Sequence, residues 1–403
     1  MKPSPPPPPL WLLALFTFSG TLGVHIFVPA LTLAGRDLHA SNAAMQMTIS
    51  LYVLGLAVGQ LIYGPLADRF GRRPVLIGGL TVYTLAGLGA VLASLSPDGV
   101  AALTVARLFQ ALGGCSGMVL GRAIVRDTSN GQAIAQRMAY LNMMVMLPPA
   151  LAPLLGSLIA AGLGWRATLG ALLLLGVVNL TLVWRRLPES RSSAVRGNTG
   201  QLARDYARLL TSRRFLGYML GGGCATTSIY AFIASAPFIF AHQLGRPEHE
   251  VGLYLTALVS GMWMGNALCS RVLGRVPLVR ILMLGNSLSL ACCGLLLVLA
   301  LAGAASMPAV LLLMFLFSLG SGSCSPAALT LALNVNPTVA GSASGLYGSA
   351  QMAVGALCTA LAGLGGASPL TVTALVLVCV CLLAQAAFHM ARRAPLEEQV
   401  VGE

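Results

Sequence analysis

Long apolar stretches dominate this sequence of 403 residues and restrict what it can fold into. A helix that crosses a bilayer needs about 20 predominantly apolar residues, and stretches of this kind recur twelve times along the chain. They show no alternation of period two, which argues against a β-barrel. We therefore predict an all-α membrane protein with twelve transmembrane helices, at residues 10–31, 45–66, 74–95, 99–121, 140–163, 167–184, 215–240, 251–271, 279–302, 307–333, 339–364 and 370–390.

The charged residues are few and unevenly distributed. They make up 9% of the chain, against about 25% in soluble domains. A net charge of +13 would suggest nucleic-acid binding in a soluble protein. Here, of 24 Lys and Arg residues, 20 fall on one side of the predicted membrane and three on the other, namely Arg36, Arg166 and Arg246. This is the positive-inside pattern. It predicts a multi-pass membrane protein with both termini in the cytoplasm, and no nucleic-acid partner.

An arginine-rich polar segment separates six predicted spans from the next six. We expect an N-terminal bundle at 1–186, a cytoplasmic linker at 187–213, a C-terminal bundle at 214–391 and a cytoplasmic tail at 392–403. Residues 202–210 are expected to form a short surface helix, with Arg204 and Arg208 facing anionic lipid headgroups. The glycine-rich sequence at 113–117 has a counterpart at 320–324. Two repeats around a central cavity are typical of secondary transporters.

The loop between the second and third predicted spans reads GPLADRFGRRP at residues 64–74. A glycine allows a tight turn here, and a proline suits the first turn of the next helix. The aspartate can either cap that helix or pair with an arginine. The loop resembles motif A of the major facilitator superfamily, and the resemblance implies a gating role for Gly64, Asp68, Arg69, Gly71, Arg72 and Arg73.

A second charged pattern, RAIVRD, follows the fourth predicted span at residues 122–127. It supplies partners for motif A on the same face of the membrane. We expect Asp68 to pair with Arg126, or Arg72 with Asp127, and either pair would favour a state closed toward the cytoplasm.

The fourth predicted span contains an arginine, Arg107. Arg107, Gln110 and Gly114 share one helical face, and together with Gly113 they resemble motif B of the same superfamily. A buried arginine in a membrane helix is costly and indicates function. The alternative is an arginine that reaches the membrane interface, because Arg107 lies only about eight residues from the external end of the span.

The fifth predicted span reads LAPLLG at residues 151–156. This core resembles that of the Bcr/CflA-like drug:proton antiporters, as do SAPF at 235–238 and further matches from the first span to the last. The resemblance implies the major facilitator fold, two six-helix bundles with alternating access, and efflux of drug-like molecules by proton antiport. It also implies a place in the bacterial cytoplasmic (inner) membrane. Prolines bend helices and glycines allow close packing, so we expect helix-bend roles for Pro148, Pro149, Pro153 and Gly156.

One feature of the resembling family is missing. Its members usually carry an aspartate in the first span, at the position that His25 occupies here, and no predicted span contains an interior carboxylate. If protons drive transport, His25 is the best carrier, with Arg107 as its coupling partner, because histidine has an unperturbed pKa of about 6.5. The alternative is a neutral histidine that is hydrogen-bonded to a backbone carbonyl or a tyrosine.

A cavity without buried negative charge favours neutral, zwitterionic or anionic substrates over lipophilic cations. Polar and aromatic residues on helical faces are candidate contacts, although each could instead serve helix packing. These candidates are Thr21, His25, Tyr230, Phe238, Trp263, Asn266, Tyr347 and Gln351.

Motifs for phosphate or metal binding are not recognisable in the sequence, so we predict no cofactor, no metal and no enzymatic activity. We expect a monomer whose partners are a small-molecule substrate and membrane lipid. A rival within transport is export of a specific native metabolite, such as an anionic metallophore or a nucleoside. A rival of another class is a non-transporting polytopic membrane receptor or enzyme, against which motif A and the two-fold repeat argue.

Overall fold

The computed structural model describes residues 8–95, 99–129, 132–190, 199–272, 275–336, 339–366 and 368–394. Twelve of its helical segments are long and apolar enough to cross a membrane, which confirms the predicted all-α membrane fold. The helices of the N-terminal half are α1 (Leu10–Phe27), α2 (Leu31–Asp37), α3 (Asn42–Phe70), α4 (Arg72–Ala93), α5 (Val100–Asp127), α6 (Gln132–Leu163) and α7 (Trp165–Arg186). Those of the C-terminal half are α9 (Arg213–Thr227), α10 (Ile229–Phe238), α11 (Val251–Val272), α12 (Leu278–Leu301), α13 (Met307–Leu333), α14 (Ala340–Ala362) and α15 (Pro369–Arg393).

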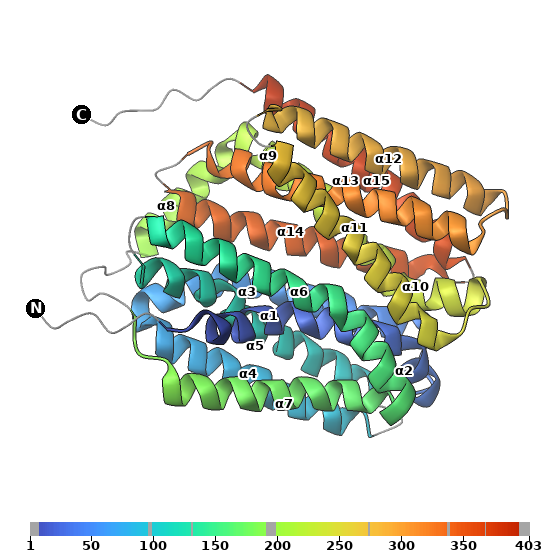
Figure 1. Cartoon of the computed structure of the whole chain (residues 1–403), viewed down its shortest axis with the longest axis horizontal. Helices are drawn as coiled ribbons and strands as arrows, with labels where there is room; N and C mark the ends of the chain where they lie inside the picture. Colours follow the sequence, from blue (N-terminus) through green and yellow to red (C-terminus); the bar gives the residue numbers. More distant parts are fainter. Residues whose placement is uncertain are drawn as a thin grey trace, which may run out of the picture.

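A short helix, α8 (Thr199–Thr211), lies between the two halves in the sequence. It covers the predicted surface helix at 202–210. In Figure 1 it lies at the same end of the bundle as the start of α1 and the end of α15. We call this the linker end, and the end that carries α2 the opposite end. Leu209 of α8 is buried while Leu210 is exposed, so only one side of the helix packs on the bundle.

The first span of each half is interrupted, which the sequence analysis did not predict. Between α1 and α2 the chain forms a single 3₁₀ turn, Val28–Ala30, at Pro29. Between α9 and α10 the helix breaks at Ser228, and a π-helical turn, Ile239–Gln243, follows Pro237. Proline cannot donate the backbone hydrogen bond that continues a helix, which explains the irregular backbone near Pro29 and Pro237.

Four spans form the centre of the molecule. Within an apolar stretch of 18 residues in each span, 83% of the residues are buried in the seventh span, 72% in the first, 67% in the fourth and 56% in the tenth. In the sixth span the share is 33%. The two halves meet mainly through α3 against α14 and α6 against α11, and Figure 1 shows the latter pair crossing. Corresponding helices of each half therefore surround the same central region.

Glycines of α5 allow neighbouring helices to approach closely. A Cβ atom at Gly117 would lie 2.7 Å from the carbonyl carbon of Phe16 in α1. A Cβ atom at Gly113 would lie 2.8 Å from the Cα atom of Tyr83 in α4. Packing between apolar helices in lipid depends on such small residues, because burial of apolar surface gains little there.

We predict that Gly117→Ala lowers the midpoint of thermal unfolding in detergent, with a penalty of about 1–3 kcal/mol for overpacking. Gly170→Ala in α7 is the matched control, because a Cβ atom there has no heavy atom within 4 Å. Intrinsic fluorescence during a thermal ramp measures both variants. Equal midpoints for the two variants would contradict the close approach of α1 and α5.

Candidate functional site

The interruptions of the first and seventh spans face each other where the two halves meet. His25 precedes the 3₁₀ turn of the first span, and Tyr230 follows the break of the seventh. Their ring centroids are 6.0 Å apart. Interrupted helices at corresponding positions of two repeats are where secondary transporters bind their substrates. We therefore take the region around His25, Tyr230 and Arg107 as the central site.

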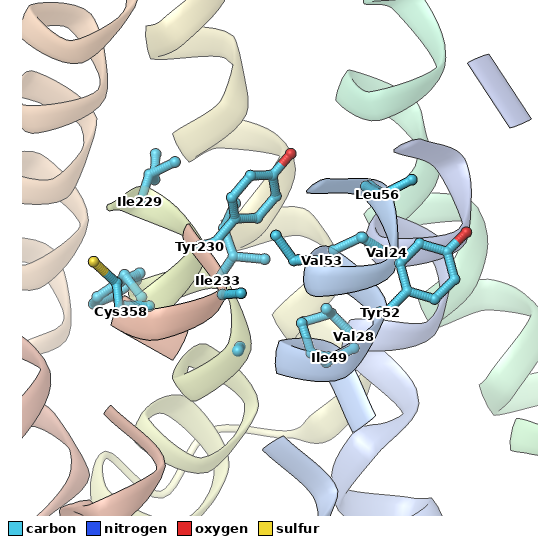
Figure 2. Close-up of a cluster of buried hydrophobic side chains, with 14 of the residues drawn as sticks. Val24, Val28, Ile49, Tyr52, Val53, Leu56, Ile229, Tyr230, Ile233 and Cys358 are labelled. Carbon is cyan, nitrogen blue, oxygen red and sulfur yellow. The ribbon is translucent and has the colours of Figure 1, made fainter. Parts of the chain in front are cut away.

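Aliphatic side chains pack around Tyr230 at this junction. Figure 2 shows Ile233 of α10 facing Val53 and Val24 of the other half, with Tyr230 beside it. These side chains, together with Val28 and Ile49, are less than a tenth exposed. We call Val24, Val28, Ile49, Val53 and Ile233 the apolar seam. It extends from the level of Tyr230 toward the opposite end.

Arg107 is fully buried (0% exposed) next to the central site. Its guanidinium donates to Oε1 of Gln110 at 2.7 Å and to the backbone carbonyl of Gly23. It also lies 4.1 Å from the ring centroid of Tyr52 and 5.1 Å from that of Phe27. Aromatic faces and carbonyl dipoles thus stabilise the charge. The alternative of an arginine that reaches the membrane interface is wrong, because the side chain turns into the bundle.

The central site contains several buried polar atoms without hydrogen-bond partners among the described residues. They are Nδ1 of His25, Nε of Arg107, Nε2 of Gln110 and the hydroxyl of Tyr83. Arg107 contacts Gly23 and Phe27 on either side of His25 in the sequence, and among the described residues it makes no hydrogen bond with His25. Unpaired buried polar groups are uncommon in folded proteins, so this group offers hydrogen-bonding capacity for a proton or a ligand.

Residues of α14 contribute to the C-terminal side of the interface. Gln351 donates through Nε2 to the hydroxyl of Thr226 at 2.8 Å and to that of Tyr347 at 3.3 Å. The hydroxyl of Thr21, in contrast, donates to the carbonyl of Phe18 in its own helix. Gln351 and Tyr347 thus join α14 to the end of α9, close to the break in the seventh span.

A cavity of about 620 Å³ lies at the linker end between α3, α5, α8, α13 and α14. Its lining includes Gln60, Asp68, Arg122, Tyr206, Tyr347 and Gln351. Arg122 and Arg126 line the cavity, and both are exposed to solvent. Solvent therefore reaches the interface between the halves from the linker end.

The opposite end is closed by contacts between the halves. Arg36 of α2 pairs with Glu248 at 3.0 Å, and the hydroxyl of Ser157 in α6 donates to the carbonyl of His249 at 2.7 Å. Gly252 of α11 packs directly against the carbonyl of Pro153. With the apolar seam beneath them, these contacts separate the central site from the opposite end.

Motif A forms an ionic network at the linker end. Arg72 of α4 pairs with Asp68 of α3 at 2.6 Å and with Asp127 of α5 at 2.8 Å. Of the two pairs expected from the sequence, the structure contains Arg72 with Asp127. The pair joins helices of one half and is formed while the cavity at this end is open, so the expected link between this pair and a state closed toward the cytoplasm is wrong. Arg126 has no carboxylate partner within the described ranges and lines the cavity instead. Gly71 has a φ of +101° at the turn, a conformation that favours glycine.

The carboxylate that caps α4 is Glu189, not Asp68. Glu189 accepts hydrogen bonds from the backbone N–H of Arg72 at 3.0 Å and of Arg73 at 3.1 Å. A carboxylate at a helix N-terminus satisfies free N–H groups and interacts favourably with the helix dipole. Sequence reasoning missed this role because Glu189 is more than a hundred residues away. The sequence contained one signal of this role: Glu189 directly follows the sixth span, on the same side of the membrane as motif A.

Some candidates from the sequence lie outside this region. Trp263 is 56% exposed, in an apolar stripe of α11 with Met264 and Leu268, so its assignment to the cavity is wrong. It belongs to the outer face of the bundle, where an indole can contact lipid. Phe238 is buried near His242, toward the opposite end. Asn266 is half-buried on the same helix as Trp263.

The proposed helix-bend residues lie within α6. The carbonyl of Pro153 contacts Gly252, and Gly156 packs against the carbonyl of Ile26 in α1. Both positions therefore serve close packing with a neighbouring helix. The side chains of Pro148 and Pro149 lie outside the described residues.

Comparison with known proteins agrees with this architecture. The sequence profile of the Major Facilitator Superfamily matches residues 13–359. Among solved structures, a D-xylose–proton symporter superimposes with a TM-score of 0.78 at 14% identity, covering 96% of this chain and 97% of that one. A bacterial homolog of the human lysosomal transporter Spinster, in an inward-facing and unoccupied conformation, gives a TM-score of 0.70 at 14% identity, covering 95% and 96%.

Relatives in sequence are named as resistance proteins. The chain is 26% identical to a bicyclomycin resistance protein homolog of Haemophilus influenzae, over 87% of each chain. It is 31% identical to a chloramphenicol resistance protein of Pseudomonas aeruginosa, over 66% of this chain and 61% of that one. It is 32% identical to multidrug resistance protein D of Escherichia coli, over 64% of each. These relatives confirm the resemblance drawn from the motifs. The chain therefore belongs to the Major Facilitator Superfamily, and it is a multi-pass inner-membrane transporter rather than an enzyme.

Proposed function

We propose that this transporter exports small drug-like molecules from the cytoplasm, and that these are neutral, zwitterionic or anionic. Export is driven by proton antiport, as the bundles at 1–186 and 214–391 rock around the central site and expose it to each side in turn. The names of the relatives, which refer to resistance to bicyclomycin, chloramphenicol and multiple drugs, support export.

The cavity at the linker end is the observation that carries this proposal. It reaches the interface between the halves from one end, while ion pairing and helix packing close the other. A transporter that alternates between two open states must pass through such a one-sided arrangement. This arrangement supports loading of substrate from the linker end.

The arginine distribution supports a cytoplasmic position for the linker end. Arg72, Arg73 and Arg186 lie at helix ends on that side, whereas Arg36 and Arg166 lie at the opposite end. Cytoplasmic loops of membrane proteins carry the excess of positive charge. With this orientation both termini are cytoplasmic, and the cavity loads from the cytoplasm.

Carboxylates are confined to helix ends in the described spans, where they occur as Asp37, Asp68, Asp127, Glu248 and Glu250. A cation transferred into the central site would therefore lose hydration and meet Arg107 instead of a negative partner. This supports substrates without a net positive charge.

His25 is our proposed proton carrier. It is the histidine at the junction of the halves, 6% exposed and without a hydrogen-bond partner for Nδ1 among the described residues. Histidine changes charge near neutral pH. An intramembrane ionisable residue is costly to maintain and indicates a function.

We predict that His25→Ala abolishes proton movement in response to chloramphenicol in everted membrane vesicles, as measured with a fluorescent pH probe inside the vesicles. Proton movement stops because the proposed carrier is removed. Downhill movement of chloramphenicol does not need this carrier and should persist. His389→Ala is the matched control, because Nδ1 of His389 is bonded to the carbonyl of Gln385 near the linker end of α15. Undiminished proton movement with His25→Ala would remove His25 from the mechanism.

A susceptibility assay in a pump-deficient strain tests the charge preference. Expression of this chain should protect against neutral, phenicol-like drugs and should leave sensitivity to ethidium-like cations unchanged, because the spans supply no negative partner for a cation. Minimum inhibitory concentrations measure both effects. Protection against the cations without protection against the neutral drugs contradicts the proposal.

We predict that the ion pairs of motif A hold α3, α4 and α5 in the positions that transport requires. We expect Asp127→Arg to slow efflux by about tenfold or more, because it removes a charge-assisted bond and leaves Arg72 beside a like charge. The double variant Arg72→Asp, Asp127→Arg should recover part of the rate. Initial rates in vesicles measure the difference. Unchanged transport in the single variant would show that the network has no gating role.

A further inference from the structure

The charges that line the linker-end cavity are not balanced. Its charged lining consists of Asp68, Arg72, Arg122 and Arg126. Asp68 and Arg72 pair with each other, and Arg72 also pairs with Asp127 behind it. Asp68, Arg72 and Asp127 together carry one net negative charge, and with Arg122 and Arg126 the five residues carry one net positive charge. Two positive charges remain on the cavity wall.

Arg122 and Arg126 are these two residues. They are four positions apart on α5, so their side chains leave the helix on the same face. Neither makes a hydrogen bond or an ion pair with any residue in the described part of the chain, and both are exposed to the cavity. Arginines that only anchor a helix at the membrane surface would face lipid headgroups. This pair faces the passage between the two halves.

Hydrogen-bond donors come to the same cavity from other elements. Tyr206 of α8 and the hydroxyl groups of Ser342 and Ser344 line it. Burial raises the pKa of the Tyr206 phenol, so this group stays protonated and can donate. The first turn of α14, which carries Ser342, contains no acidic residue, and its free N–H groups favour negative charge.

The rest of the wall is apolar. Met118, Leu120, Met138, Leu329, Leu333 and Met352 line the cavity beside the polar groups. Methionine side chains adapt to ligands of different shape. A volume of about 620 Å³ falls within the range of small-molecule sites, roughly 300–1,000 Å³.

We propose that Arg122 and Arg126 form an anion subsite that holds the carboxylate group of amphipathic monoanions, while the apolar wall holds the body of the molecule. The inference rests on the proposed export function and narrows it, because it places organic acids among the preferred substrates. The guanidinium groups donate to the carboxylate oxygens in pairs.

Two fluorescent probes that differ in one group test this subsite. Dansylglycine carries a carboxylate, and dansylglycinamide is its neutral amide. Fluorescence anisotropy with the purified full-length protein in lipid nanodiscs measures the affinity of each. The wild type should bind dansylglycine more tightly, and added salt should weaken that binding while it leaves the amide unaffected.

The double variant Arg122→Gln, Arg126→Gln should lose about tenfold or more in affinity for dansylglycine, because charged hydrogen bonds are removed. Its affinity for dansylglycinamide should stay within about twofold, which also shows that the variant is folded. Arg208→Gln is the matched control, since Arg208 is an exposed arginine of α8 outside this cavity. Equal affinity of the wild type for both probes, or equal losses for both in the double variant, overturns the inference.

Transport in proteoliposomes separates this inference from the proposed function. If dansylglycine binds as predicted but neither probe is moved, export fails and the anion subsite stands. If both probes are exported and the double variant moves them at wild-type rates, export stands and the anion subsite fails.

Discussion

The hydrocarbon interior of a membrane offers no hydrogen bonds to a polypeptide, and the architecture of this transporter follows from that constraint. Regular helices satisfy their own backbone groups, so irregular backbone is tolerated only where protein covers it. The 3₁₀ turn at Val28–Ala30 and the break at Ser228 obey this rule, because both lie in the two most buried spans. The constraint therefore places irregular backbone in the buried centre of the molecule, where the two halves meet.

Buried charge follows the same logic. Arg107 is held by a carbonyl, an amide oxygen and two aromatic rings, so its positive charge remains available to a negative ligand. Arg72, in contrast, is neutralised by two carboxylates and joins α3, α4 and α5 into one unit. Arg107 thus has no carboxylate partner among the described residues, whereas Arg72 bridges two carboxylates within one half. The difference lies in the partners rather than in the residue type.

Much of this organisation could be read from the sequence, because it depends on local pattern. The twelve spans and the place of the linker helix follow from hydrophobic runs and polar gaps. The interruptions at Pro29 and Ser228 were missed, since membrane helices often tolerate proline and serine without breaking. Trp263 was misplaced because helical spacing does not tell which face of α11 meets lipid. The cap of α4 by Glu189 required the three-dimensional proximity of the third and sixth spans.

The apolar seam also acts as electrical insulation. A proton crosses a protein along groups that donate and accept hydrogen bonds, and the side chains of Val24, Val28, Ile49, Val53 and Ile233 offer none. Each elementary charge that crosses a membrane potential of 100 mV dissipates roughly 2.3 kcal/mol. The five aliphatic side chains of the seam thus form an apolar layer between the central site and the opposite end, and this layer contains no side-chain group that could pass on a proton.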